Sequence, residues 1–160
     1  MTGSGPGPLD VALDVTPLIG ARSGVGHFVA EILDAMVGSP GIRLVPYALS
    51  LRARRGVGMP GLWRPAAGPS SLPPGTRQLP LPAGAAIAAW GRIDQPSAER
   101  WLAPATVVHG TNFVVPPMRG AGAVVTVHDL TFARFPEMVT AEVRRLVPAL
   151  RRAVDRGAWV

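Results

Sequence analysis

Two short runs of β-branched residues in the second half of the chain constrain its fold more than any other feature. Thr106 to Val108 and Ala123 to Val127 are apolar, too short for helices, and rich in valine, which packs well in a pleated sheet. A histidine follows or closes each run, with further polar residues directly behind it. In open α/β sheets ligands bind beyond the carboxyl ends of the strands. The pattern therefore predicts a site formed by His109, Asn112, His128 and Asp129.

A strand, a glycine-containing loop and a helix follow one another near the amino terminus. Leu9 to Val15 is predicted as a strand, and Val25 to Val37 carries apolar residues at helical spacing. Ser23 is a suitable N-cap for that helix. Ile42 to Leu49 is a second strand, in which Pro46 indicates an interruption or a nearby sheet edge. This is the order of a βαβ unit, so we expect an α/β fold: a Rossmann-like parallel sheet with flanking helices.

The pattern is weaker in the rest of the chain. Residues 50 to 82 are rich in Pro, Gly and Arg and predict a long connection with one short strand at Arg77 to Leu81. Helical residues follow, with Ser97 as a candidate cap, and Thr140 is a candidate cap of a last helix. Ala158 to Val160 begin another strand. The buried stripe of the last helix is predicted to be Val143, Leu146, Val147, Leu150 and Val154.

The length of 160 residues suits one α/β domain with a single core and is short for two. We expect residues 1–8, a Gly/Pro/Ser segment, to be a disordered leader, and residues 9–160 to form one domain. Because the sequence stops on an apolar strand start, we expect this domain to be truncated at its carboxyl end. Neither a signal peptide nor a spanning helix is recognisable, which predicts a cytoplasmic protein.

Composition excludes several chemistries. The chain has no cysteine and no lysine, so thiolate nucleophiles, cysteine-based zinc sites, Schiff bases and a P-loop lysine cannot occur. Two histidines on separate strands with one neighbouring acid match no compact ligand spacing, so we expect no metal. The dinucleotide motif G-x-G-x-x-G is not satisfied because residue 29 is Val, which disfavours a nicotinamide-dependent oxidoreductase.

The turn Gly24-Val25-Gly26 opens the first predicted helix, where free backbone amides favour an anionic ligand. The alternative is that the two glycines only allow helix and strand to pack closely. His128 is the candidate catalytic residue, and its alternative is a structural hydrogen bond. Asp129 either contacts ligand or caps the turn that follows it, and His109 shapes its loop rather than carrying chemistry.

The net charge of +6 is concentrated in the middle of the chain. Eight arginines between Arg43 and Arg100 face only two acids, whereas the remainder is balanced. This surplus allows peripheral contact with an acidic membrane surface at the inner face of the membrane. Nucleic acid is disfavoured, because one aromatic residue is interleaved and no recognised motif accompanies it. The alternative is a solvated loop. The residues concerned are Arg52, Arg54, Arg55 and Arg64, with Trp63 among them.

Three motifs resemble one family. DVTPLIGARSGVGHFVAEILDAM is similar to the opening of family 4 retaining glycosyltransferases with the GT-B architecture. VVHGTNFVVPP and VVTVHDLTFARFPE look like the paired strand-end motifs further along the same amino-terminal domain. The resemblance runs from about Leu9 to Val160, although Thr106 stands where the family often has an acid. It implies the amino-terminal, acceptor-side half of a GT-B enzyme that transfers a sugar from a nucleotide-sugar donor to a glycan or lipid-linked acceptor.

The resemblance also implies roles for single residues. Gly24 and Gly26 match the loop that approaches the donor phosphates and the acceptor, and His128 matches the histidine beside the transferred sugar. No metal or other cofactor is implied, because helix-terminal amides and basic side chains stabilise the leaving diphosphate. The carboxy-terminal domain with its Glu-containing donor motif is not among these residues. The isolated chain is therefore expected to be inactive. The alternative function is a non-catalytic binding module whose arginine-rich loop docks on acidic lipid or nucleic acid.

Overall fold

The computed structural model describes residues 7–19, 23–50 and 72–160. Most of the expected leader lies outside these ranges. The arginine-rich loop proposed to dock on acidic surfaces lies outside the described residues as well, with Arg52, Arg54, Arg55, Arg64 and Trp63.

A five-stranded, all-parallel sheet forms the centre of the molecule, with strand order β3-β2-β1-β4-β5. Its strands are β1 (Leu9–Asp14), β2 (Ile42–Leu49), β3 (Arg77–Leu79), β4 (Val107–Gly110) and β5 (Gly122–Val125). The helices among the described residues are the 3-10 helix η1 (Thr16–Leu18), α1 (Gly24–Met36), α2 (Ala83–Trp90), α3 (Glu99–Leu102), α4 (Thr131–Arg134) and α5 (Ala141–Asp155). The predicted Rossmann-like α/β fold is therefore confirmed.

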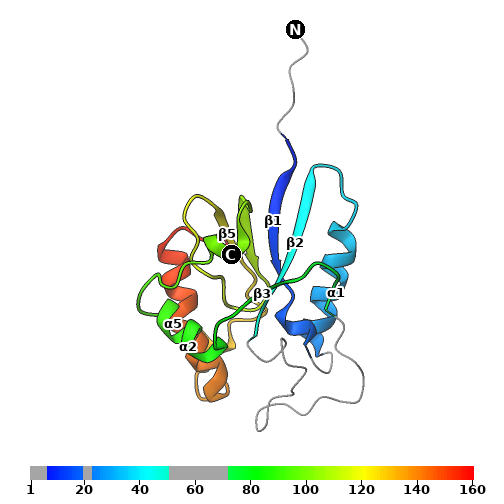
Figure 1. Ribbon diagram of the computed structural model, residues 1–160. Helices are drawn as coiled ribbons and strands as arrows, with labels where there is room; N and C mark the ends of the chain where they lie inside the picture. The colour runs from blue at the N-terminus through cyan, green and yellow to red at the C-terminus, as the bar shows by residue number, and fades with distance from the viewer. Residues whose placement is uncertain (1–6, 20–22, 51–71) are drawn as a thin grey trace.

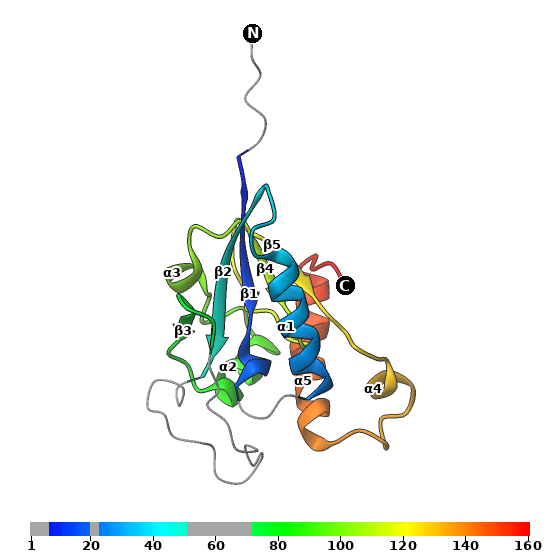
Figure 2. The same cartoon turned by 90° about the vertical axis from the view of Figure 1, so that its right-hand side faces the viewer.

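The helices form two layers around the sheet. Helix α1 covers one face, and α2 and α5 cover the other (Figures 1 and 2). Strand β1 lies at the centre, and its side chains alternate between the two cores. Ala12 packs into the larger core with Trp90 of α2, and Leu13 packs against Val29 of α1. Ala12 and Leu13 are both fully buried. This alternation fixes the register of the central strand, because a slip by one residue would move each side chain into the opposite core.

Both long helices begin at the predicted caps. The Ser23 hydroxyl accepts a hydrogen bond from the Gly26 N–H at 3.3 Å, and the Thr140 hydroxyl accepts one from the Val143 N–H at 3.4 Å. The cap predicted at Ser97 is wrong: Ala98 occupies the N-cap of α3 and makes no side-chain cap bond. The Ala98 N–H donates instead to the Pro117 carbonyl, so packing against the 112–118 segment fixes that helix start.

The buried stripe of α5 differs from its prediction. Leu150 is buried as expected, but Val154 is 45% exposed, and the small residues Ala149 and Ala153 are the ones fully packed. The reason is the close approach of α2: a Cβ added to Gly91 would lie only 3.0 Å from the Pro148 Cβ. Alanines suit such a tight contact, so the buried face turns away from Val154.

The two predicted strands that organise the site are shifted by one or two residues. β4 continues through His109 to Gly110, so His109 lies within the strand instead of after it. β5 ends at Val125, so His128 lies three residues beyond the strand. After α5 the chain returns to the sheet, because the Trp159 N–H donates to the Ala123 carbonyl at 2.9 Å. This parallel bridge is the strand start expected near Val160.

Strand β2 runs without interruption through Pro46, which pairs with Leu13 of β1. The Tyr47 carbonyl faces β1, where it accepts the Val15 N–H at 2.8 Å. Because backbone groups of successive residues point to opposite sides of a strand, the Pro46 nitrogen faces the outer edge. Within the described residues, β3 pairs with Tyr47–Leu49 only. The proline therefore sits where its missing N–H costs no hydrogen bond of the sheet.

Gly110 at the end of β4 provides a test of the fold. A Cβ there would overlap the Val114 backbone, 2.6 Å from its carbonyl carbon and closer to its oxygen. Gly110→Ala should therefore lower the free energy of unfolding by about 3 kcal/mol in urea titrations. Gly84→Ala is the control, because an added Cβ on α2 meets no atom within 4 Å. Its stability should stay equal or rise by up to about 1 kcal/mol. Equal losses for both variants would contradict the packing described for Gly110.

Candidate functional site

The strand order reverses between β1 and β4. From β1 the chain proceeds outward to β2 and β3, and then returns to the other side of β1 as β4. Such a switch point leaves a crevice beyond the carboxyl ends of the two central strands, where ligands bind in open α/β sheets. Here the crevice is closed at its base by Thr111, which is fully buried and donates its hydroxyl to the Asp14 carbonyl at 2.9 Å. This hydrogen bond joins the ends of β1 and β4 at the base of the crevice.

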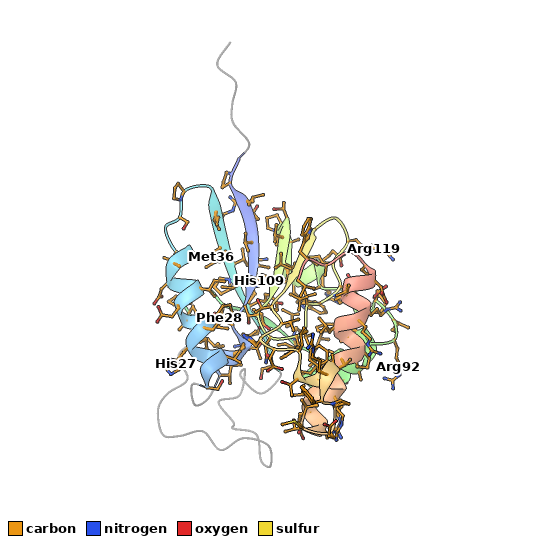
Figure 3. All side chains as sticks on the ribbon, turned by 180° about the vertical axis from the view of Figure 1, so that it is seen from behind. His27, Phe28, Met36, Arg92, His109 and Arg119 are labelled. Atoms are coloured by element: carbon orange, nitrogen blue, oxygen red, sulfur yellow. The ribbon has the colours of Figure 1, made fainter. Side chains whose placement is uncertain are left out.

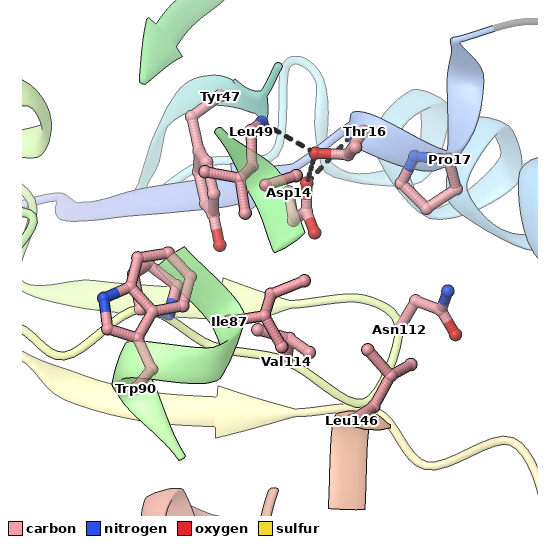
Figure 4. Close-up of a pocket in the computed structure, with 12 residues that line it drawn as sticks. Asp14, Thr16, Pro17, Tyr47, Leu49, Ile87, Trp90, Asn112, Val114 and Leu146 are labelled. Atoms are coloured by element: carbon pink, nitrogen blue, oxygen red, sulfur yellow. Dashed lines mark hydrogen bonds between the residues drawn. The ribbon is translucent and has the colours of Figure 1, made fainter. Parts of the chain in front are cut away.

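A cavity of about 180 Å³ lies above this base, between the ends of β1 and β2 and the helices α2 and α5 (Figure 4). Its sheet side carries polar groups of Asp14, Thr16 and Tyr47, and its opposite side carries the apolar side chains of Ile87 and Leu146. The remaining described lining residues are Pro17, Leu49, Ala83, Trp90, Asn112, Val114 and Pro116. Mostly apolar walls with a few convergent polar groups are typical of small-molecule sites.

Asp14 is a buried carboxyl group at the end of β1. Its Oδ1 accepts the Thr16 N–H at 2.8 Å and also the Thr16 hydroxyl. Within the described part of the chain no arginine or histidine lies within ion-pair distance of it. Burial raises the pKa of Asp14 from 3.8 to about 6, and the two bonds from Thr16 only partly oppose this. The ionised form is therefore present at neutral pH but poorly compensated.

The hydroxyl of Tyr47 lines the same cavity. Tyr47 is 1% exposed, and its hydroxyl oxygen is buried without a hydrogen-bond partner among the described residues. Burial, and secondarily the Asp14 carboxylate, raises the pKa of Tyr47 well above its ordinary value, so the phenol stays protonated. A buried unpaired hydroxyl costs stability. Its position in a cavity beside a carboxylate suggests that a ligand satisfies it.

His128 lies at the same end of the sheet, on the far side of β4. Its Nε2 lies 2.9 Å from the Thr111 carbonyl oxygen, and because that oxygen can only accept, Nε2 carries the proton. The ring meets Phe28 of α1 edge-on, with centroids 5.2 Å apart. It also contacts Phe113, which has a left-handed backbone with φ 59°. In the neutral ring, the remaining nitrogen Nδ1 is then a hydrogen-bond acceptor.

His128 lines a groove of about 650 Å³ that is separate from the Asp14 cavity. Asp129 lies in the same groove, together with Leu130, Arg151 and Val154. The Asp129 carboxylate accepts the Thr131 N–H at 2.8 Å, as a turn cap does. This bond favours the capping interpretation of Asp129, although the side chain is exposed and can still meet a ligand.

His109 is held by the protein itself. Its Nε2 lies 2.8 Å from the Thr126 hydroxyl, and burial lowers its pKa below the ordinary value. In β4 it is in register with Leu13, so it projects towards the α1 face of the sheet (Figure 3). His109 belongs to the described lining of neither cavity. The structure therefore places it in a structural bond between β4 and the segment after β5.

The predicted site residues are thus divided among four places, of which the position of His109 within β4 is one. Asn112 lines the Asp14 cavity, whereas His128 and Asp129 line the groove beside α5. The turn Gly24-Val25-Gly26 forms the first turn of α1, whose Phe28 touches the His128 ring. Gly24 is exposed, and an added Cβ there would meet nothing within 4 Å.

Asp14 and Tyr47 are not among the site residues predicted from the sequence. A usable signal was present for Asp14, because an acid at the carboxyl end of an apolar first strand faces the crevice of a parallel sheet. Tyr47 gave no such signal, since an aromatic residue within a strand is normally a core residue.

The raised pKa of Asp14 gives a pH-dependent test. A carboxyl whose pKa is higher in the folded state contributes stability below its unfolded pKa of 3.8, and that contribution is lost as the pH rises through about 6. Asp14→Asn removes this loss while keeping an oxygen for Thr16. Urea unfolding should show wild type and variant equally stable near about pH 4. At about pH 7.5 the variant should be more stable by about 3 kcal/mol, from 1.36 kcal/mol per pKa unit. A pH-independent difference would contradict the burial of an ionised Asp14.

Within the described residues no three His, Cys, Asp or Glu side chains gather as a metal site would require. None of the helices that the structure describes is long and apolar enough to cross a membrane. Comparisons of the chain with protein-family models, with curated proteins and with solved structures found no match.

Proposed function

We propose that this chain is the acceptor-side domain of a retaining glycosyltransferase that uses a nucleotide-sugar donor. The observation that carries the proposal is the contact between His128 and helix α1. The centroids of the His128 and Phe28 rings are 5.2 Å apart. This contact brings the strand-end histidine beside the helix that opens with Gly24 and Gly26. Helix-terminal amides and an exposed imidazole at one edge suit a ligand that joins phosphates to a sugar.

In this proposal the residues of the chain bind and orient the sugar. The Thr111 carbonyl holds the Nε2–H of His128, so the imidazole is fixed in one tautomer before a ligand arrives. Nδ1 then accepts a hydrogen bond from a sugar hydroxyl, and the Phe28 and Phe113 rings limit movement of the imidazole. The free amides at the start of α1 offset negative charge that develops on the leaving diphosphate.

A second domain is part of the proposal, because the described residues offer no full nucleotide site. Large apolar side chains near the His128 groove support such a partner lobe. Leu130 is 56% exposed, Phe135 51% and Met138 72%, all on or beside α4. Several large apolar side chains exposed along one short stretch of chain support an interaction surface there.

The first test compares two proteins. The chain alone should transfer sugar from labelled nucleotide sugars to glycan or lipid acceptors only at the rate of a blank. Transfer should appear when the chain is expressed joined to a donor-binding second domain, because the nucleotide is then held. Efficient transfer by residues 1–160 alone would overturn the two-domain proposal, and no transfer by any joined protein would overturn the assignment as a transferase.

The second test concerns His128 in the active, joined protein. His128→Ala should lower kcat/KM for transfer by about 10- to 100-fold, the usual effect of one hydrogen bond to a polar reacting group. Glu31→Ala, an exposed substitution on the outer face of α1, is the control and should leave kcat/KM unchanged. An unchanged rate in His128→Ala, with both variants equally stable to urea, would contradict the role assigned to the imidazole.

A further inference from the structure

The Asp14 cavity has an unusual charge balance. The chain carries 16 arginines and a net charge of +6, yet none of the described arginines pairs with Asp14. At the other end of the same strand, the Asp10 carboxylate accepts hydrogen bonds from Arg43 Nε and Nη2, with Nη2 to Oδ2 at 2.6 Å. Among the described residues, one acid of β1 is therefore neutralised and the buried one has no cation beside it. A buried carboxylate is normally paired, because desolvation makes an isolated charge expensive.

The hydrogen-bonding capacity around Asp14 is also incomplete. Thr16 occupies Oδ1, and Oδ2 accepts no hydrogen bond within the described residues. Tyr47, beside it, is 1% exposed, and its hydroxyl has no hydrogen-bond partner among the described residues. Figure 4 shows the two groups on the same wall of the cavity, facing α2 and α5. A donor placed between them would satisfy both.

The size and walls of the cavity restrict what that donor can belong to. Its volume is about 180 Å³. A cavity of about 150 Å³ holds one benzene ring. The walls opposite Asp14 are apolar, from Ile87, Val114 and Leu146, and Trp90 offers an aromatic surface. Among the described lining residues Asp14 and Tyr47 are the titratable ones, so no cation of the lining competes with a positively charged ligand.

We propose that this cavity binds a small organic cation: a group about the size of one six-membered ring that carries a protonated amine. The ammonium donates to Asp14 Oδ2 and to the Tyr47 oxygen, and the ring packs against Ile87 and Leu146. The ligand supplies the positive charge that none of the described arginines brings to Asp14. This site is separate from the His128 groove and does not depend on the proposed sugar transfer.

Cyclohexylammonium is a suitable probe, with cyclohexanol as its neutral counterpart of similar shape. Titration into the ¹⁵N-labelled chain should shift the Asn112 side-chain amide and the Thr16 backbone amide in a saturable way. Cyclohexanol should bind at least about tenfold more weakly, because a charged hydrogen bond is lost. Binding of cyclohexylammonium should weaken about tenfold from about pH 7.5 to about pH 5, as Asp14 becomes protonated.

Variants separate this site from general attraction to surface acids. Asp14→Asn should weaken binding of cyclohexylammonium at least about tenfold, whereas Asp34→Asn, an exposed carboxylate on α1, should leave it unchanged. Tyr47→Phe should weaken binding about fivefold and raise the Tm by about 3 °C, since it deletes an unsatisfied hydroxyl. Thr76→Val, a hydroxyl outside the cavity lining, should weaken binding by less than about twofold.

Three results would overturn the proposal: no saturable shift at Asn112 and Thr16, equal binding of cyclohexanol, or equal binding by Asp14→Asn. Stronger binding of methyl hexosides than of cyclohexylammonium would instead assign the cavity to neutral polyols. These measurements use binding alone, so they stay informative if sugar transfer is never observed.

Discussion

Threonine hydroxyls at the switch point hold the central strands together where their backbone pairing ends. The Thr16 hydroxyl accepts the Leu49 N–H at 2.9 Å and donates to Asp14, so it joins the ends of β1 and β2. The Thr111 hydroxyl joins the ends of β1 and β4 through the Asp14 carbonyl, and the Thr111 carbonyl in turn holds His128. A series of hydrogen bonds thus links the Asp14 cavity to the His128 groove. Both candidate sites depend on it for their geometry.

The two acids of β1, Asp10 and Asp14, differ in whether an arginine pairs with them and in the direction of their pKa shift. Arg43 holds the pKa of Asp10 below its ordinary value, and that pair lies at the far end of the strand from both sites. Asp14 has no such partner in the part of the chain that the structure describes, and burial raises its pKa. Groups with perturbed pKa values gather at functional sites, because such sites need reactivity that the fold alone would not select. The carboxyl edge of the sheet is therefore where this chain departs from optimal packing.

The sequence predicted the fold well where its signals were local. The βαβ unit, the caps at Ser23 and Thr140 and the extent of β2 depend on periodicity and on neighbouring residues, and the structure confirms them. The cap at Ser97 and the burial of Val154 depend on tertiary contacts, which periodicity does not encode, and both predictions were wrong. The site residues were predicted at the carboxyl edge of the sheet, which is the edge where the cavity and the groove lie. The division of the site into a cavity and a groove could not be foreseen, because side-chain direction beyond a strand end is set by loop geometry.

Pro46 has a consequence for the behaviour of the protein in solution. An uncovered strand edge offers a row of free N–H and carbonyl groups to which another chain can add a strand. Among the described strands, the section of β2 from Ile42 to Pro46 has β1 on one side, and β3 pairs only with the three residues that follow. A proline whose nitrogen points outward there removes a donor that an incoming strand would need. In the described sheet, Pro46 therefore disfavours the addition of a further strand to β2 and costs no hydrogen bond of its own sheet.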